Sequence, residues 1–155
     1  MRPGAAGGIA VLPMYDRPEI RAETDAFWAR LREAIRDAGL DAPETLDRTR
    51  PMRLALTAPE LVLGQTCGLP YVRALAGRVG LVGAPAYDLE GCAPGEYRSA
   101  LIARPGAAAG GLAALRGARP ALNARDSQSG YGALMTAAAP HARGGAFFGP
   151  PVITG

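Results

Sequence analysis

This chain of 155 residues contains one local pattern twice: a short apolar run, a loop of small polar residues, and a segment that favours a helix. In the first copy the apolar run is 61–63, the loop is 64–68, and Pro70 suits the first turn of the helix. In the second copy the run 120–123 and a polar loop precede the alanine-rich stretch 132–139, which Pro140 ends. Strands that alternate with helices predict a largely parallel sheet with helices on its faces, so we expect an α/β fold.

The other apolar runs extend this α/β pattern. Further strands are expected at 9–14, 44–47, 79–82, 97–103 and 152–155. Further helices are expected at 25–38, around 59–60, at 69–76 and at 112–115. The helix 25–38 should end at Gly39, and one face of it carries Phe27, Trp28, Leu31, Ala34, Ile35 and Ala38. We interpret that face as core packing.

The loop at 126–131 is the strongest candidate for a binding site. It lies where the first free N–H groups of a helix point outward, and the helix dipole there favours an oxyanion. Ser127 and Ser129 add hydroxyl donors, and Gly130 would let a ligand approach the backbone closely. An ordinary helix N-cap explains the same residues. The second loop, 64–68, favours the ligand interpretation, because ligands of open α/β sheets bind beyond the carboxyl ends of strands.

Composition excludes several classes of function. There is no lysine, so a Walker-type phosphate loop and a Schiff-base lysine are excluded. The net charge is +3, and the arginines of the predicted first helix alternate with acids, which argues against a nucleic-acid partner. Cys67 and Cys92 are too few for a zinc site, and the sequence leaves open whether they are bridged. We expect no metal and no cofactor.

The sequence also bears on localisation. No stretch approaches the ~20 apolar residues of a membrane span, so direct membrane insertion is not expected. No signal-peptide pattern is recognised in the first residues.

Two further alternatives remain open at this point. One is a cysteine-dependent hydrolase, with Cys67 near a helix start and His141, the single histidine, as its base. The other is a truncated fragment without independent function, suggested by the strand-like final residues.

Four segments, taken together and in order, resemble one known family. They are 12–16, 63–68, 97–99 and 126–131. They resemble the phosphate/phosphite/phosphonate substrate-binding proteins of ABC importers. The resemblance implies a type 2 periplasmic-binding fold, in which two α/β lobes with mostly parallel sheets close on a ligand in the cleft between them. It runs from about Ile9 onward, and the second lobe would be incomplete in this sequence.

The resemblance also implies roles for individual residues. Residues 1–98 would form the first lobe, and 99–155 would form the crossover strand and the start of the second. The serine-rich loop would hold phosphoryl oxygens, Gln65 and Thr66 would face it, and Tyr15 would be the aromatic residue after the first strand. The candidate ligand contacts are Tyr15, Gln65, Thr66, Tyr97, Ser127, Gln128, Ser129, Gly130 and Tyr131. The expected function is non-catalytic binding of a small anionic ligand and its delivery to an ABC transporter permease. The expected location is the periplasm, with the cytoplasm as the alternative.

Overall fold

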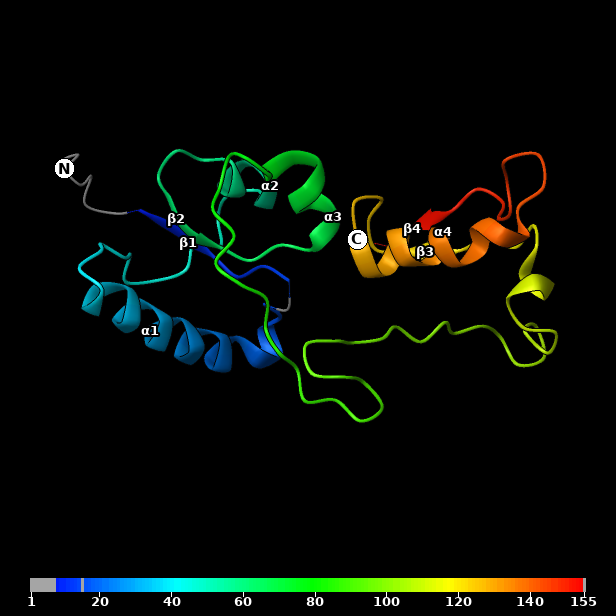
Figure 1. Cartoon of the computed structure of the whole chain (residues 1–155), viewed down its shortest axis with the longest axis horizontal. Coiled ribbons are helices and arrows are strands. Elements are labelled where there is room, and N and C mark those ends of the chain that lie inside the picture. Colours follow the sequence, from blue (N-terminus) through cyan, green and yellow to red (C-terminus); the bar gives the residue numbers. More distant parts are fainter. Residues whose placement is uncertain (1–7, 15, 155) are drawn as a thin grey trace. The chain divides into compact units, whose positions relative to one another are not determined.

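The chain forms two compact units in the computed structural model, which describes residues 8–14 and 16–154 (Figure 1). The first unit comprises Met1–Cys67 with Tyr71–Arg78, and the second comprises Gly68–Pro70 with Val79–Gly155. Each unit is built around its own pair of short parallel strands. The division into lobes 1–98 and 99–155 stays a prediction.

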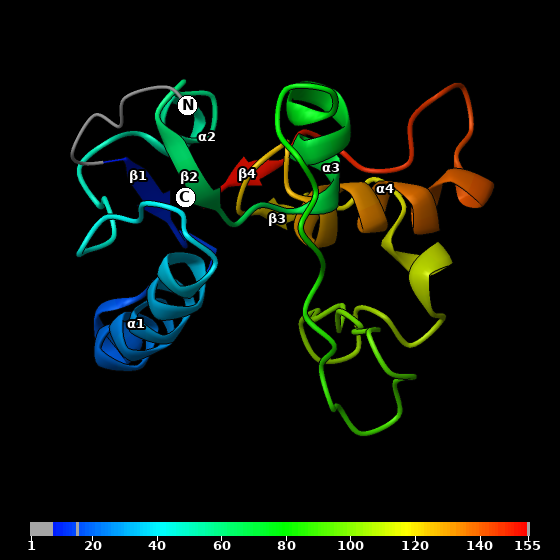
Figure 2. The same ribbon diagram turned by 60° about the vertical axis from the view of Figure 1, so that its left-hand side comes forward.

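The first unit is a parallel strand pair covered by a long helix. Strand β1 (Ile9–Val11) pairs with β2 (Leu61–Gly64), with Ile9 opposite Leu61 and Val11 opposite Gly64. A short 3-10 turn, η1 (Pro18–Ile20), leads into α1 (Arg21–Asp37), whose ribbon lies beside the strands in Figures 1 and 2. Both strands occur where the apolar runs predicted them, although β1 is shorter than expected.

The core of the first unit surrounds the single tryptophan. Trp28 is only 2% exposed and clusters with Ala10, Leu12, Ala42 and Leu46. Three half-buried side chains pack against that cluster: Leu31, Ile35 and Leu63. The predicted apolar face of the helix is therefore confirmed at these positions.

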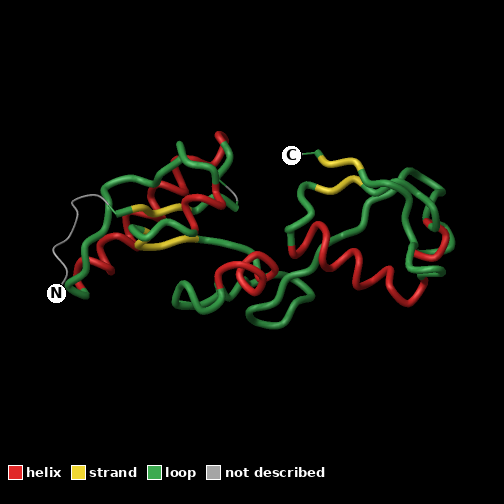
Figure 3. The backbone as a smooth tube through the Cα atoms, turned by 90° about the horizontal axis from the view of Figure 1, so that it is seen from above, coloured by secondary structure: helices red, strands yellow, loops and turns green. Residues whose placement is uncertain are grey.

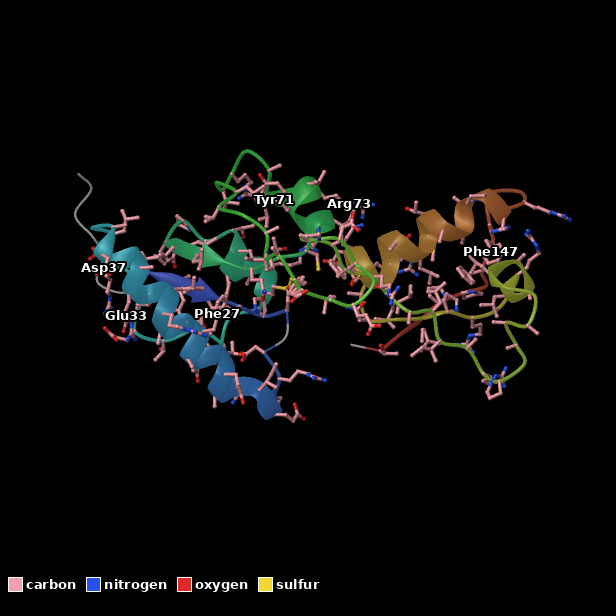
Figure 4. The ribbon with its side chains drawn as sticks, turned by 60° about the horizontal axis from the view of Figure 1, so that its bottom comes forward. Phe27, Glu33, Asp37, Tyr71, Arg73 and Phe147 are labelled. Atoms are coloured by element: carbon pink, nitrogen blue, oxygen red, sulfur yellow. The ribbon has the colours of Figure 1, made fainter. Side chains whose placement is uncertain are left out.

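The C-terminal end of α1 follows from its sequence, but three residues assigned to its core face, Phe27, Ala34 and Ala38, are exposed. Gly39 adopts φ +77°, a conformation that residues with a Cβ rarely adopt, and it ends the helix as predicted. The helix begins four residues earlier than predicted, directly after η1. Phe27 (Figure 4) is 47% exposed, so its assignment to the core face was wrong.

Two predicted elements of the first unit are corrected by the structure. The helix expected around 59–60 is instead α2 (Met52–Leu56), because Pro51 stands at its N-cap and Pro59 lies in the turn before β2. The strand expected at 44–47 is irregular. Asp47 N–H donates to the Ala10 carbonyl at 2.8 Å, but the Asp47 carboxylate also accepts from the Thr49 and Arg50 amides, and this turns the chain.

The second unit pairs β3 (Ala121–Leu122) in parallel with β4 (Val152–Ile153). After β3 the chain forms one helical stretch in three parts: a wide π-helical turn η4 (Gln128–Gly132), α4 (Ala133–Ala138) and a final 3-10 turn η5 (Ala139–His141). Figure 3 shows this stretch as continuous helix beside the short strands. The strand 120–123 and the alanine-rich helix were both predicted. The helix extends further in both directions than predicted.

Two helical segments elsewhere agree with the sequence. The stretch predicted as helix 69–76 forms α3 (Gly68–Pro70), which belongs to the second unit, followed by the π-helical turn η2 (Tyr71–Leu75) of the first. A 3-10 turn, η3 (Leu112–Leu115), occupies the predicted short helix 112–115.

The strands predicted at 79–82 and 97–103 do not form. Both lie in the long loop that connects η2 to η3, and their apolar side chains are exposed: Val82 is 89% and Ile102 is 94% exposed. An apolar run becomes a strand only when a neighbour completes its hydrogen bonds and covers one face. Broadly, the described residues form an α/β arrangement of helices and a few short parallel strands.

Candidate functional site

The polar loop that precedes η4 is fixed by its own side chains. Ser127 is 6% exposed, and its Oγ accepts a hydrogen bond from the Gly130 amide at 3.0 Å. This is N-cap geometry, in which the serine oxygen satisfies a free amide of the first helical turn. The Ser127 carbonyl accepts from the Tyr131 and Gly132 amides. The capping alternative considered for this loop is therefore present in the structure, and it engages Ser127.

The space beside Gly130 is filled from within the same unit. A Cβ placed on Gly130 would collide with Oδ1 of Asn123 and would lie 3.1 Å from Oγ of Ser127. Gly130 therefore allows the backbone to approach Asn123, which follows β3. Asn123 was not among the candidate residues. A polar side chain as the last residue of the predicted strand 120–123 was the signal that would have identified it.

A groove of about 450 Å³ lies next to this loop, within the second unit. Three candidate residues line it: Tyr97, Gln128 and Ser129. Ser99 adds a further hydroxyl. The apolar part of the lining consists of Leu101, Ala133, Leu134 and Ala137. The groove thus combines a phenol, two hydroxyls and a carboxamide with an apolar floor. Neutral hydrogen-bond donors of this kind suit a small polar ligand.

Tyr97, which lines the groove, packs against the nearby Tyr87. Its ring meets that of Tyr87 edge-on, with ring centroids 6.2 Å apart, and Tyr97 remains 47% exposed. Two tight turns between these tyrosines contain glycines at positive φ, Gly91 (+74°) and Gly95 (+81°). Nη2 of Arg98 donates to the Glu90 carbonyl at 3.4 Å and so closes the loop.

Tyr131 lies on a different surface of the second unit. It lines a second groove of about 410 Å³, together with Arg125, Met135, Phe147 and ten other residues. Phe147 and Phe148 meet edge-on there, with centroids 4.7 Å apart, and Arg116 lies over the Phe147 ring at 5.2 Å (Phe147 is labelled in Figure 4). The structure therefore does not bring Tyr131 into the groove that contains Gln128 and Ser129.

In the first unit, Gln65 and Thr66 follow the carboxyl ends of the parallel strands. The Gln65 amide donates to the Val11 carbonyl at 2.9 Å, which extends the β1–β2 pairing by one residue. Its side-chain Oε1 accepts from the Met14 amide at 3.4 Å. The Thr66 hydroxyl donates to the Cys67 carbonyl at 3.5 Å. Both side chains are half-buried at the strand ends, as predicted for this topology. The remaining candidate, Tyr15, lies outside the described residues.

The two side chains proposed for a hydrolase lie in different chemical surroundings. Cys67 Sγ lies 4.0 Å from Met14 Sδ in the first unit, and both cysteines are free. His141 belongs to the second unit, where its ring lies 5.9 Å from that of Phe147 and its carbonyl accepts from Arg116. Neither contact supplies an acid or a base, so these surroundings add no support for the hydrolase alternative.

The second unit has a small excess of cations. Residues 79–155 contain six arginines and four acids, Asp88, Glu90, Glu96 and Asp126. No group of three or more His, Cys, Asp or Glu side chains with metal-site geometry occurs in the part of the chain that the structure describes. Among those same residues, no helix has the length and apolar character needed to cross a membrane.

Comparisons with protein-family models, curated proteins and solved structures give no match to this chain.

Proposed function

We propose that this chain is a non-catalytic binding protein for a small oxyanion of the phosphate, phosphite or phosphonate type. The observation that carries the proposal is the groove lined by Tyr97, Gln128 and Ser129. These residues come from two stretches about 30 positions apart, and all three are among the ligand contacts that the sequence predicts. All three line one groove of about 450 Å³, a size that suits a small ligand.

The chemistry of the groove favours an anion with oxygen acceptors. Hydroxyl, phenol and carboxamide groups donate hydrogen bonds, and such bonds become charge-assisted when the acceptor is an oxyanion. The small excess of arginines over acids in residues 79–155, six against four, is compatible with an anionic ligand. The Ser127 hydroxyl is engaged with the Gly130 amide, so its role is to hold the loop and Ser129 is the serine available to the ligand.

The finer parts of the proposal rest on the resemblance to importer substrate-binding proteins. They are the two-lobed type 2 architecture, the contacts from Tyr15, Gln65 and Thr66, and delivery to an ABC transporter permease. The periplasm is the proposed compartment, with the cytoplasm as the alternative.

Calorimetric titration of the full chain with phosphate, phosphite, methylphosphonate and a sulfonate tests the proposal. We expect binding of at least one phosphorus oxyanion, and its Kd should rise about tenfold or more in Ser129→Ala, because a hydrogen bond to a charged group is worth roughly 1.5–3 kcal/mol. Thr136→Ala is the matched control, since Thr136 is an exposed hydroxyl residue on α4 outside the groove lining. A lack of binding to all four anions would refute the proposal.

A tyrosine pair offers a second, independent control. Tyr97→Phe removes a hydroxyl from the groove, whereas Tyr87→Phe removes one from the ring that only packs against Tyr97. We expect weaker binding in Tyr97→Phe alone. Equal effects of the two substitutions would mean that the aromatic contact, and not the phenol, matters.

A further inference from the structure

The second unit contains a groove that the proposed function does not use. We call it the aromatic groove: it is the space of about 410 Å³ lined by Tyr131, Phe147 and their neighbours. It shares no lining residue with the groove that contains Gln128 and Ser129. Ligand pockets in proteins typically measure about 300–1,000 Å³, so the aromatic groove is large enough for a small organic molecule.

The helical stretch after β3 supplies one wall of each groove. Tyr131, Met135 and Ala138 line the aromatic groove, and their spacing of four and three positions places them on one helical face. Ala133 and Ala137, four positions apart, line the other groove. The two sets of residues thus belong to different faces of the same stretch, and each groove has its own wall.

The floor of the aromatic groove is buried and apolar. Leu122 of β3 and Ala138 of α4 are each 2% exposed, and Phe147 is 7% exposed. Phe148 meets Phe147 edge-on and also lines the groove (Figure 4 labels Phe147). A flat apolar group suits such a floor, because aromatic rings bury a large area and make edge-to-face or offset contacts with one another.

The polar groups of the lining are few. Arg125 is its one charged side chain, and Tyr131 adds a phenol hydroxyl. Asp126, next to Arg125 in the sequence, is not part of the lining. No salt bridge joins Arg125 to an acid within residues 8–14 and 16–154. A guanidinium presents parallel N–H donors that match the two oxygens of a carboxylate, so the charge complement of this lining is one carboxylate.

We propose that the aromatic groove is a second binding site, and that its ligand is a small aromatic carboxylate. The ring lies on the floor formed by Leu122 and Phe147, and the carboxylate pairs with Arg125 and accepts from the Tyr131 hydroxyl. This inference goes beyond the proposed function and does not depend on it, because the two grooves are lined by different residues.

Methyl NMR with phenylacetate as the probe locates the ligand. Labelling the methionine methyl groups with ¹³C gives one signal for each methionine, and Met135→Leu assigns the signal of Met135. Met135 lines the aromatic groove, whereas Met52 belongs to the first unit and serves as the internal reference. We expect phenylacetate to shift the Met135 signal and to leave that of Met52 unchanged. An unchanged Met135 signal at millimolar phenylacetate would overturn the proposal.

Two analogues separate the contributions of the ring and the charge. Phenylacetamide keeps the ring and lacks the charge, and acetate keeps the carboxylate and lacks the ring. We expect each to bind about tenfold or more weakly than phenylacetate, because one loses the charge-assisted hydrogen bonds and the other the apolar contact. Equal affinity for phenylacetate and phenylacetamide would overturn the assignment of a carboxylate.

A pair of arginine variants tests the cation. Arg125→Gln removes the charge from the lining, whereas Arg119→Gln removes an exposed charge of the same unit that is not in the lining. In calorimetry the Kd of phenylacetate should rise about tenfold or more in Arg125→Gln and change by less than about twofold in Arg119→Gln. Equal changes in the two variants would overturn the role of Arg125.

A second pair of variants fills one groove at a time. Ala139 lines the aromatic groove and Ala137 lines the other, and both are exposed residues of the same helical stretch. Leucine is nearly as good a helix former as alanine, so both substitutions suit the helix. Ala139→Leu should abolish the binding of phenylacetate, and Ala137→Leu should leave it unchanged. The reverse result would place the ligand in the other groove and overturn the proposal. Circular dichroism checks that each variant is folded, and if Ala139→Leu does not fold, the exposed arginine pair still decides the outcome. Failure of the phosphorus oxyanions to bind would refute the proposed function and leave the phenylacetate result intact.

Discussion

Asn123 and Gly130 fit together in the second unit: the carboxamide oxygen of Asn123 occupies the place that a Cβ on Gly130 would need. Asn123 follows β3, and Gly130 lies inside η4, so their contact ties the end of the strand to the start of the helix. The φ of Gly130 is not positive, so the requirement for glycine here is one of space. The loop that carries the groove residues Gln128 and Ser129 is held by the Ser127 cap.

Gly130→Ala should destabilise the chain. The added methyl group would meet Asn123 and Ser127, and such overpacking costs typically about 1–3 kcal/mol. Gly68→Ala is the matched control, because a Cβ on Gly68 meets nothing within 4 Å. Urea denaturation measures both free energies of unfolding. The double variant Asn123→Ala/Gly130→Ala should recover part of the loss, and an equal loss in the single and double variants would contradict the steric explanation.

Alanine substitution should show that Ser127 supports the fold, whereas Ser129 does not and is available for the ligand. Ser127→Ala removes the hydroxyl that caps the Gly130 amide, so the free energy of unfolding should fall by about 1 kcal/mol. Ser129 lines the groove, and its substitution by alanine should change stability by less than about 0.5 kcal/mol. Chemical denaturation of the two variants checks this. Equal destabilisation would show that both serines support the loop.

The sequence predicted those elements that contain their own local signals. The parallel strands β1, β2, β3 and β4 follow from short apolar runs, and the end of α1 follows from Gly39. These features depend on neighbouring residues, so a pattern of a few positions is enough to reveal them.

What the sequence could not predict depends on distant partners. The run 44–47 has the composition of a strand, but the Asp47 carboxylate accepts from the Thr49 and Arg50 amides and turns the chain there. The run 97–103 is apolar enough for a strand, yet the described chain provides no neighbouring strand to pair with it. In the candidate site, Tyr97, Gln128 and Ser129 were predicted to contact ligand and share a groove. Tyr131 was predicted with them because it belongs to the segment 126–131 that carries the family resemblance, but it lines the other groove of the second unit.

Lowering the pH should destabilise the first unit, because it protonates the carboxylates that pair with arginines, Asp16, Glu44 and Glu60. Hydrogen bonds from Arg48 lower the pKa of Asp16, a hydrogen bond from Arg36 lowers the pKa of Glu44, and one from Arg50 lowers the pKa of Glu60. A carboxyl group whose pKa is lower in the folded state stabilises the fold above its unfolded pKa, about 3.9 for Asp and 4.3 for Glu. That stabilisation is lost as the pH falls through the folded pKa.

Urea denaturation at a series of pH values between about 6 and about 3 measures this effect. The free energy of unfolding should fall as the pH is lowered through the acidic end of that range. In Arg48→Gln the fall should be shallower, because the pKa of Asp16 would return towards its ordinary value. Parallel curves for the two proteins would mean that the Arg48 pair contributes nothing to acid stability.

Trp28 and Phe27 are adjacent aromatic residues on α1, and their truncation should destabilise the chain to very different degrees. Trp28 is 2% exposed and lies among Ala10, Leu12 and Leu46, so Trp28→Ala leaves a large cavity in the only described core cluster of the first unit. Such truncations cost about 3–5 kcal/mol. Phe27 is 47% exposed, so Phe27→Ala should cost less than about 1 kcal/mol. Because Trp28→Ala also removes the only indole, unfolding is followed by circular dichroism in both variants. Comparable losses would show that Phe27 is covered in solution, and its predicted place on the core face would then be restored.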